Sequence, residues 1–409
     1  MTDREFMGLL SVLAVLGLVA IRVPVGIAMG LVAFGGISVA VSLKAALGVL
    51  SAVPFEMVGD WNLSAIPMFI LMGYVAASSD LTRNLFRSAR ITLGWLPGGL
   101  ASATVISAAL FASASGSSVA TAAAFSRTAV PEMLKANYAP SLATGAVAAA
   151  GTLGALIPPS VLLILYGVYA QVSVGQLFMA GFIPGLLSAL IYMAMIMIRV
   201  KVTPGLAGTV EINPTAEERR EAFRDVWPLP TLILVVLGGI FTGIFSPTEA
   251  GALGAFAALV IAILRRRLTR AALFEAVTQA VVSTASIFII LIGSLFFTRF
   301  LALSGFPRAF SDAILSVSTE TWWILFAVAV IFLVLGMLID SIGLLLLTLP
   351  ILVPLVNEAG INPVWFGIIV IKLLEIGLIT PPIGLNVYMI NGALNNRVTL
   401  PEIFRGITW

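Results

Sequence analysis

Two residue types are absent from this 409-residue chain, which contains no cysteine and no histidine. Without cysteine it has no disulfide, no thiolate nucleophile and no cysteine-bound metal. Without histidine it lacks the imidazole that binds many metals and that activates the serine of Ser–His hydrolases. The composition therefore argues against an intramembrane serine protease and against the common protein metal sites.

Charged residues are scarce, at 10% of the chain against about 25% in soluble proteins. Hydrophobic residues make up 60%, and apolar runs of about 20 residues, long enough to cross a bilayer, recur along the sequence. The first run follows residues 1–6, which carry no strongly basic segment and no cleavage site, so we expect a retained helix rather than a signal peptide. These features predict an all-α polytopic membrane protein.

The positions of the few charged residues also exclude some classes of function. No lysine follows a glycine, so the chain lacks the Gly-Lys-Ser/Thr of a phosphate-binding loop, which argues against an ATP-driven pump. The net charge of +3 does not indicate a nucleic-acid partner, because the basic residues lie in loops that face a membrane surface.

The sequence repeats itself at an offset of 223 residues. GALIPPSVLLILY (154–166) aligns with GLITPPIGLNVYM (377–389), which pairs the Pro-Pro of Pro158 with that of Pro381. The same offset pairs Pro24 with Pro247 and Pro131 with Pro354. Proline and glycine could coincide by chance in a chain rich in both, but three separate regions keep one register without a gap. We interpret the chain as two repeats.

Residues 1–170 are predicted to form repeat one and residues 227–395 repeat two. A connecting helix and a polar cytoplasmic linker occupy 171–226, and a C-terminal tail occupies 396–409. Each repeat is expected to hold a re-entrant helix–turn–helix (about 98–137 and 321–357) and then a proline-broken helix (about 141–169 and 361–390). Simple helices are predicted near 7–22, 25–43, 63–79, 176–198, 229–245, 247–264 and 276–298.

The arrangement of basic residues predicts the orientation. If both helix–turn–helix units enter and leave on one side, five crossings precede repeat two, which is then inverted. Of the 22 lysines and arginines, 16 fall on one side, four on the other, and Arg127 and Lys372 remain unassigned. The rich side should be cytoplasmic, with the N-terminus periplasmic and the C-terminus cytoplasmic. Inverted repeats with broken helices indicate a secondary transporter with its site near the bilayer midplane.

The Pro-Pro breaks are the first candidate sites. Pro158 and Pro159 carry no N–H, so the carbonyls of Gly154 and Ala155 lose their helical partners. The equivalent carbonyls in repeat two belong to Gly377 and Leu378. A sodium ion could satisfy such oxygens, although a neighbouring helix could do so as well. Side-chain oxygens near the breaks could add ligands, and these belong to Thr152, Ser160, Thr380 and Asn386.

The second candidate is the segment FASASGSSVATAAAF (111–125), which crowds small and hydroxylic residues into an apolar run. It could form a tight hairpin tip or a small-residue packing seam. The offset favours a tip, because it pairs Ser117 with Asp340 and Ser118 with Ser341. An ionisable residue inside an apolar run is functional by default.

Other charged residues are weaker signals. Glu375 follows Lys372 by three residues on a helix, so the two could form a structural pair or act directly. Arg127 is expected to extend toward the cytoplasmic interface. Three arginines share one face of LTRNLFRSARITLGW, which predicts an amphipathic interfacial helix, and these are Arg83, Arg87 and Arg90.

Five ordered segments now carry a family resemblance: IPMFILMG, SGSSVATAAAF, GTLGALIPPS, FSPTEAGA and EIGLITPPIG. Together they resemble the large, DctM-like membrane (M) subunit of the tripartite ATP-independent periplasmic (TRAP) transporters, across nearly the whole chain. The resemblance implies an elevator-type transporter of the bacterial inner membrane, coupled to Na⁺ and without a covalent cofactor. It also implies a small four-helix Q-type membrane subunit and a P-type periplasmic binding protein. That protein would deliver a small organic anion such as a C4-dicarboxylate, a keto acid or sialic acid.

The resemblance also implies site roles. One sodium site would join the first tip to the first break, using Gly116, Ser117, Thr152, Gly154, Pro158 and Ser160. The other would join the second tip to the second break, using Asp340, Gly377, Thr380 and Pro381. The substrate would lie between the tips, near Ser117, Ser118, Asp340, Ser341 and Asn386. No small-subunit region precedes Met1, so we expect an unfused subunit that needs a separate partner chain.

Three alternatives stay open at the level of sequence. A stand-alone transporter of another inverted-repeat family could couple to protons through Asp340 and Glu375, and it would need no binding protein. A channel subunit would show flux that neither saturates nor requires sodium. An intramembrane enzyme is the weakest alternative, because no histidine is present to activate a serine.

Overall fold

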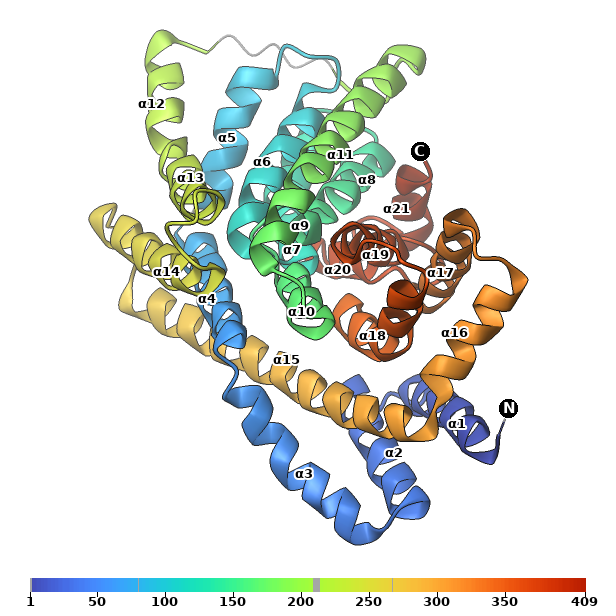
Figure 1. Cartoon of the computed structure of the whole chain (residues 1–409). Helices are drawn as coiled ribbons and strands as arrows, with labels where there is room; N and C mark the ends of the chain where they lie inside the picture. Colours follow the sequence, from blue (N-terminus) through green and yellow to red (C-terminus); the bar gives the residue numbers. More distant parts are fainter. Residues whose placement is uncertain (1, 80, 209–213, 267) are drawn as a thin grey trace.

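The computed structural model describes residues 2–79, 81–208, 214–266 and 268–409 and contains helices but no strand within these ranges (Figure 1). Seven helical segments in this part of the chain are long and apolar enough to cross a membrane, and three shorter apolar helices accompany them. The prediction of an all-α polytopic membrane protein is confirmed.

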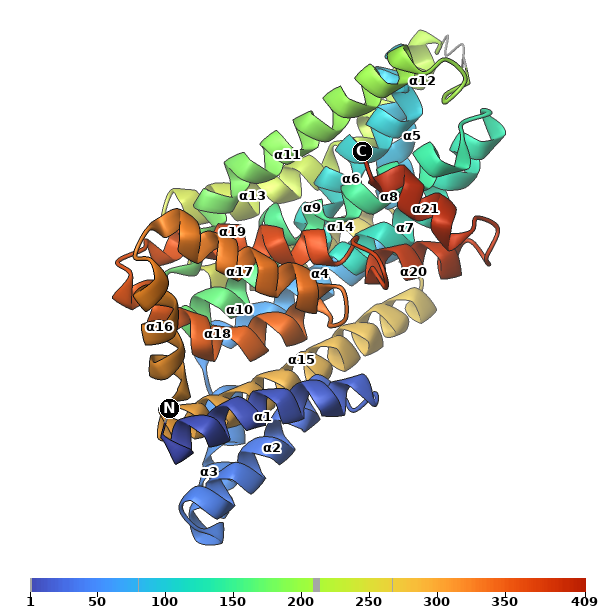
Figure 2. The same ribbon diagram turned by 90° about the vertical axis from the view of Figure 1, so that its right-hand side faces the viewer.

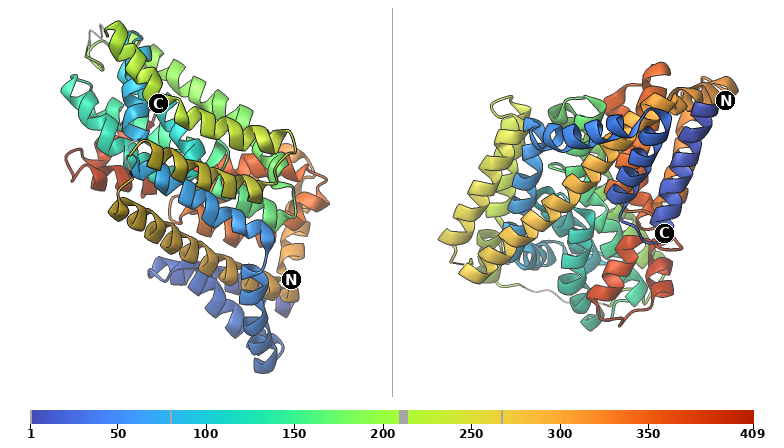
Figure 3. Two further views of the ribbon diagram at one scale, coloured as in Figure 1. Left: turned by 90° about the vertical axis from the view of Figure 1, so that its left-hand side faces the viewer. Right: turned by 90° about the horizontal axis from the view of Figure 1, so that it is seen from below.

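One group of helices forms a frame along one side of the molecule. The long helix α15 (Arg270–Ser304) runs diagonally across this side and packs on α2 and α4 (Figures 1 and 2). In turn α14 packs on α4, and α13 packs on α14. The other frame helices are α1 (Asp3–Ala20), α2 (Val25–Ala40), α3 (Leu43–Val58), α4 (Ala65–Ser78), α13 (Pro228–Phe241) and α14 (Pro247–Leu264). The view from below in Figure 3 shows α1 and α2 alongside each other next to α15.

The hairpins and broken helices form a second group, the body, which packs beside the frame. In repeat one they are α6 (Gly99–Ser115), α7 (Ser118–Lys135), α8 (Pro140–Gly151), α9 (Leu153–Leu156) and α10 (Val161–Ala170). In repeat two they are α17 (Thr321–Gly336), α18 (Ser341–Glu358), α19 (Pro363–Gly377) and α20 (Leu385–Ala393). Because α10 packs on α18 and α20 packs on α7, each broken helix touches the hairpin of the other repeat. The connecting helix α11 (Val174–Val202) lies across both halves of the body.

The helix bounds keep the 223-residue offset. Adding 223 to the bounds of α7 gives those of α18, and the same shift brings the start of α8 to the start of α19. Both ends of α2, shifted likewise, fall within one residue of the ends of α14. The register found in a few prolines therefore extends to the helices of the frame and of the body.

Four helices were missed by the sequence analysis. These are α3, α12 (Ala216–Val226), α16 (Phe306–Val317) and α21 (Leu400–Ile407), which the analysis left as loops, as part of the polar linker or as the tail. Each is short and carries charged residues or proline, so a search for apolar runs of about 20 residues passes over it. The offset could have found α16, because shifting α5 (Leu81–Leu93) by 223 lands within two residues of its bounds. Parts of the predicted linker (209–213) and the counted Arg267 lie outside the described residues.

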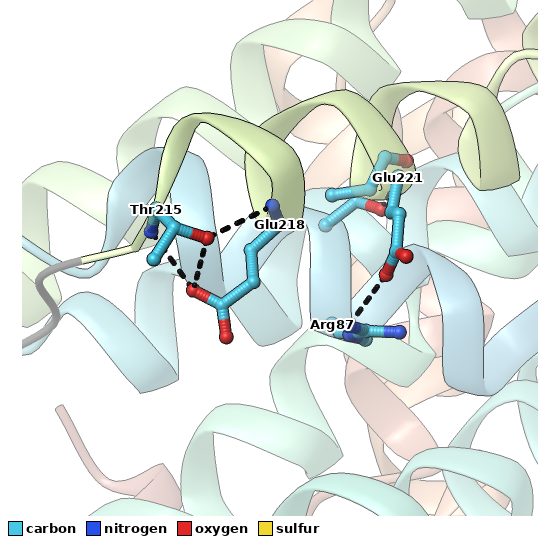
Figure 4. A network of polar contacts seen from close by, with 6 residues as sticks. Arg87, Thr215, Glu218 and Glu221 are labelled. Carbon is cyan, nitrogen blue, oxygen red and sulfur yellow. Dashed lines mark hydrogen bonds and ion pairs between the residues drawn. The ribbon is translucent and has the colours of Figure 1, made fainter.

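The predicted amphipathic helix is α5, and the linker helix α12 packs against it. Arg87 forms an ion pair with Glu221 of α12 at 3.4 Å (Figure 4). The Ser88 hydroxyl donates to the Ala222 carbonyl at 2.8 Å. Arg90 forms an ion pair with Glu132 of α7 at 3.1 Å. The arginine-rich face of α5 therefore ties the linker helix to the first hairpin.

Candidate functional site

The tip of the first hairpin is built around a glycine in the left-handed region. Gly116 ends α6 with φ 58°, a conformation that residues with a Cβ rarely adopt. Ser117 then caps α7, and its hydroxyl accepts a hydrogen bond from the Ala120 amide at 3.3 Å. The Thr121 hydroxyl bonds the Ser117 carbonyl at 2.8 Å. The backbone at this tip is consequently held from both sides of the turn.

The first break packs directly on the first tip. A Cβ added at Gly154 would lie 2.8 Å from the Ser117 carbonyl carbon and oxygen and 2.9 Å from the Ser118 amide nitrogen. A Cβ at Gly116 would in turn lie 3.0 Å from the Pro159 carbonyl oxygen. Ser160 is fully buried and caps α10 by accepting from the Leu163 amide at 3.5 Å. The structure thus brings Gly116, Ser117, Gly154 and Ser160 of the first predicted set together.

The second tip has a related construction. Asp340 caps α18, and its carboxylate accepts a hydrogen bond from the Gly343 amide at 2.9 Å. The second break approaches this hairpin at Gly377, where an added Cβ would lie 2.8 Å from the Cα atom of Gly336. The tip and the break therefore meet again, but the contact falls four residues before Asp340 instead of at the cap itself.

The two breaks differ in their surroundings. Both Pro-Pro bonds are cis, but Pro158 and Pro159 are buried whereas Pro381 and Pro382 are exposed. The carbonyls predicted to be free in repeat two are satisfied by the chain itself. The Gly377 carbonyl accepts from the Thr380 amide, and the Leu378 carbonyl accepts from the Asn386 amide, both at 3.1 Å. Each of these carbonyls therefore has one donor within the chain, and a second lone pair remains on each oxygen.

Four side chains near the tips and the second break are buried and have no hydrogen-bond partner. They are Ser118 and Ser341, at the first helical position after each tip, and Glu375 and Asn386, on either side of the second break. Asn386 is fully buried and Glu375 is 1% exposed. A buried polar group without a partner costs about 1–3 kcal/mol, so such a concentration indicates a place where a ligand completes the bonding.

Four other side chains in the described residues share this property. In the part of the chain that the structure describes, the remaining unpartnered buried atoms belong to Arg90, Ser102, Thr284 and Ser311, on four different helices. Those four do not gather at a tip or a break. Half of the unpartnered buried side chains in the described residues therefore lie at the tips and beside the second break.

Glu375 and Lys372 do not form the ion pair that their spacing allowed. The Lys372 ammonium instead donates to the hydroxyls of Ser188 and Tyr192 on α11, each at 3.2 Å. The Glu375 carboxyl has Ser118 as its neighbour across the repeats, close enough to interact but not in hydrogen-bond geometry. Ser188 and Tyr192 could not have been found from the repeat pattern, because α11 lies outside both repeats.

The remaining predicted residues have other partners or lie outside this cluster. The Thr152 hydroxyl donates to the Ala149 carbonyl at 2.7 Å and lies 3.2 Å from the Tyr192 hydroxyl. The Thr380 hydroxyl donates to the Ile376 carbonyl at 2.6 Å. Arg127 is exposed on α7. The side chains of Thr152 and Thr380 are therefore already bonded within the chain.

A solved structure shares this fold. The chain is similar to the YdaH transporter of Alcanivorax borkumensis, whose topology is described as unusual, with a TM-score of 0.60 and 15% identity. The similarity covers 89% of this chain and 85% of that one. At this level of identity the likeness concerns the fold alone.

Three relatives in sequence are named as permease proteins of TRAP transporters. The chain is 35% identical to the C4-dicarboxylate large permease protein DctM of Pseudomonas aeruginosa, over 82% of this chain and 78% of that one. It is 34% identical to the sialic acid large permease protein SiaM of Vibrio cholerae, with the same coverage. It is also 34% identical to the isethionate permease protein DctMQ of Oleidesulfovibrio alaskensis, over 92% of this chain, but it spans only 59% of that longer protein.

These relatives are membrane transport subunits rather than enzymes, which agrees with the reading of the sequence. A family model for the DctM component of the tripartite ATP-independent periplasmic transporters matches residues 12–407. The match covers both hairpins, both breaks and all of the frame except the start of α1. The chain therefore belongs to the DctM component family of the tripartite ATP-independent periplasmic transporters.

Proposed function

We propose that this subunit carries out sodium-coupled uptake of a small organic anion of the carboxylate, keto-acid or sugar-acid class. A P-type periplasmic binding protein would deliver the anion, and a small Q-type membrane subunit would complete the complex in the bacterial inner membrane. The N-terminus would be periplasmic and the C-terminus cytoplasmic. The proposal is supported by relatives whose names specify C4-dicarboxylate and sialic acid as substrates. Because the chain belongs to the DctM family, it is not a transporter of another inverted-repeat family.

The observation that carries the proposal is the set of buried side chains without partners at the tips and the second break. Sodium is a hard cation and takes oxygen ligands. Ligands of this kind are present in the hydroxyls of Ser118 and Ser341, the carboxyl of Glu375 and the amide oxygen of Asn386. The same tips begin α7 and α18, so free backbone N–H groups at the helix N-termini favour an anion. Cation ligands and an anion-binding element therefore occur together.

An elevator motion is proposed from the division into frame and body. The frame meets the first tip at Gly73 of α4, where an added Cβ would lie 2.8 Å from the Ser115 Cα atom. It meets the second tip at Val25 of α2, beside Gly343. Both tips thus abut frame helices, and a body that slides along the frame would carry tips and breaks together across the membrane.

The experiment is sodium-dependent thermal unfolding of the purified chain in detergent, with choline at equal ionic strength as the reference. The informative variant is Ser118→Ala with Ser341→Ala. Substituting Ser117 or Asp340 is less informative, because both cap helices and the loss of a cap alone costs about 1 kcal/mol. The matched control is Ser102→Ala, which also removes a buried, unpartnered serine hydroxyl from the first hairpin helix.

We expect sodium to stabilise the wild type and the Ser102→Ala control, by about 2.7 kcal/mol at a hundredfold excess over Kd. The double variant should lose this gain. An equal gain in the double variant would show that the sodium ion does not bind at the tips. In proteoliposomes with the partner subunits, uptake that neither saturates nor needs sodium would instead favour a channel. Uptake driven by a proton gradient alone would contradict sodium coupling.

A further inference from the structure

A groove of about 740 Å³ opens along the C-terminal half of α11, where this helix faces α8 and α21. One wall is apolar and belongs to α11, through Ile191, Ile198 and Val202, which are 53%, 62% and 74% exposed. The groove is also lined by Ser141 and Thr203. None of the predicted tip or break residues lines it, so it is separate from the site described above.

Two arginines line the same groove. Arg199 of α11 and Arg405 of α21 lie close enough for their charges to repel each other. Within the described ranges, neither forms an ion pair with an Asp or Glu side chain. Arg199 is held by a bond from its Nη1 to the Gly406 carbonyl at 3.2 Å, and its guanidinium lies 5.2 Å from the centre of the Trp409 ring. Two neighbouring cations without a carboxylate make this end of the groove attractive to an anion.

The position of the groove along the membrane limits the chemical class of ligand that can fill it. The apolar wall is part of α11, a 29-residue helix that is long and apolar enough to span the bilayer. The arginines lie at its C-terminal end, and a tryptophan follows α21, as expected at a membrane–water interface. A ligand that fills the groove must therefore present an apolar chain to α11 and an anionic group to the arginines.

We propose that this groove binds an anionic phospholipid. Its phosphate would be held by Arg199 and Arg405, with the Ser141 and Thr203 hydroxyls available as further donors, and an acyl chain would lie along the exposed face of α11. The predicted orientation places this end at the cytoplasmic leaflet, where anionic lipids are attracted to basic pockets between helices. Because α21 packs on α8, the lipid would link α11 to the helix that leads into the first break.

The test is lipid titration of the full chain in detergent, followed by native mass spectrometry, which resolves each lipid adduct. Phosphatidylglycerol is compared with phosphatidylcholine of the same acyl chains. The informative variant is Arg199→Gln with Arg405→Gln, and Arg199→Lys with Arg405→Lys keeps the charge. The control is Arg219→Gln with Arg220→Gln, which removes two exposed charges from α12.

We expect the wild type to prefer phosphatidylglycerol, and the double glutamine variant to bind it about 25-fold more weakly, since each basic group contributes about fivefold. The lysine variant and the α12 control should retain most of the preference. Equal binding of both lipids by the wild type, or unchanged binding by the glutamine variant, overturns the proposal. Displacement of the lipid by about 10 mM inorganic phosphate would also overturn the proposal, because it would show that the groove binds a soluble anion. If the double variant fails to fold, Arg405→Gln alone keeps the Arg199–Gly406 bond and should lose about fivefold.

Discussion

Replacing Gly154 by alanine tests whether the contact between the first tip and the first break forms a binding site. The added methyl group would lie 2.8 Å from the carbonyl carbon and oxygen of Ser117. Ordinary contact begins at 3.4 Å, so tip and break must separate by about 0.6 Å. The obstructing atoms are backbone in a capped turn, and no side-chain rotation can relieve the contact.

The magnitude has two parts. Overpacking of this kind costs about 1–3 kcal/mol in a well-packed interior. Cation sites require ligand distances to within about 0.2 Å, so a separation of this size should weaken sodium binding at least tenfold, about 1.4 kcal/mol. The first part lowers stability in any salt, whereas the second appears only as a smaller difference between sodium and choline.

The assay is unfolding of the purified chain in both salts, with Gly30→Ala as the matched control. Gly30 lies in α2 and nothing lies within 4 Å of an added Cβ. Both substitutions share the gain of about 0.5–1 kcal/mol that alanine brings to a helix, so their difference isolates the clash. If Gly154→Ala matches Gly30→Ala in stability and in sodium response, the tip–break contact is not a binding element and the reasoning fails.

Three further outcomes are expected. Glu375→Gln should reduce the response to sodium, because it removes a buried carboxyl group whose oxygens have no hydrogen-bond partner and could bind the ion; an unchanged response would contradict this. Tyr192→Phe should cost about 1–2 kcal/mol by chemical denaturation, because it removes the hydroxyl shared by Thr152 and Lys372, and a change within about 0.5 kcal/mol would argue against the network. Glu132→Gln should change stability by less than about 1 kcal/mol, since both of its ion pairs are partly exposed; a larger loss, measured likewise, would show that α5 depends on it.

Several features could be predicted from the sequence because they depend on neighbouring residues. Long apolar runs determine which segments are membrane helices, whatever their packing partners. The small residues around Gly116 and the cap at Asp340 mark both hairpin tips, since turn and cap preferences act within a few residues. The Pro-Pro pairs likewise mark the breaks. The helices that were missed are those whose stability comes mainly from packing an amphipathic face, such as α16 and α21.

The tertiary structure decided which polar groups are left without partners. The sequence predicts that the Gly377 and Leu378 carbonyls lose their helical partners, yet the Thr380 amide before the break and the Asn386 amide beyond it bond them. It treats Lys372 as a partner for Glu375, yet a tyrosine on α11, 180 residues away, takes the ammonium. The bond between Lys372 and Tyr192 depends on the distance between two segments that are far apart in the chain. Composition and local propensity therefore determine the helices and turns, while the packing of α7, α11, α19 and α20 determines which oxygens remain for a ligand.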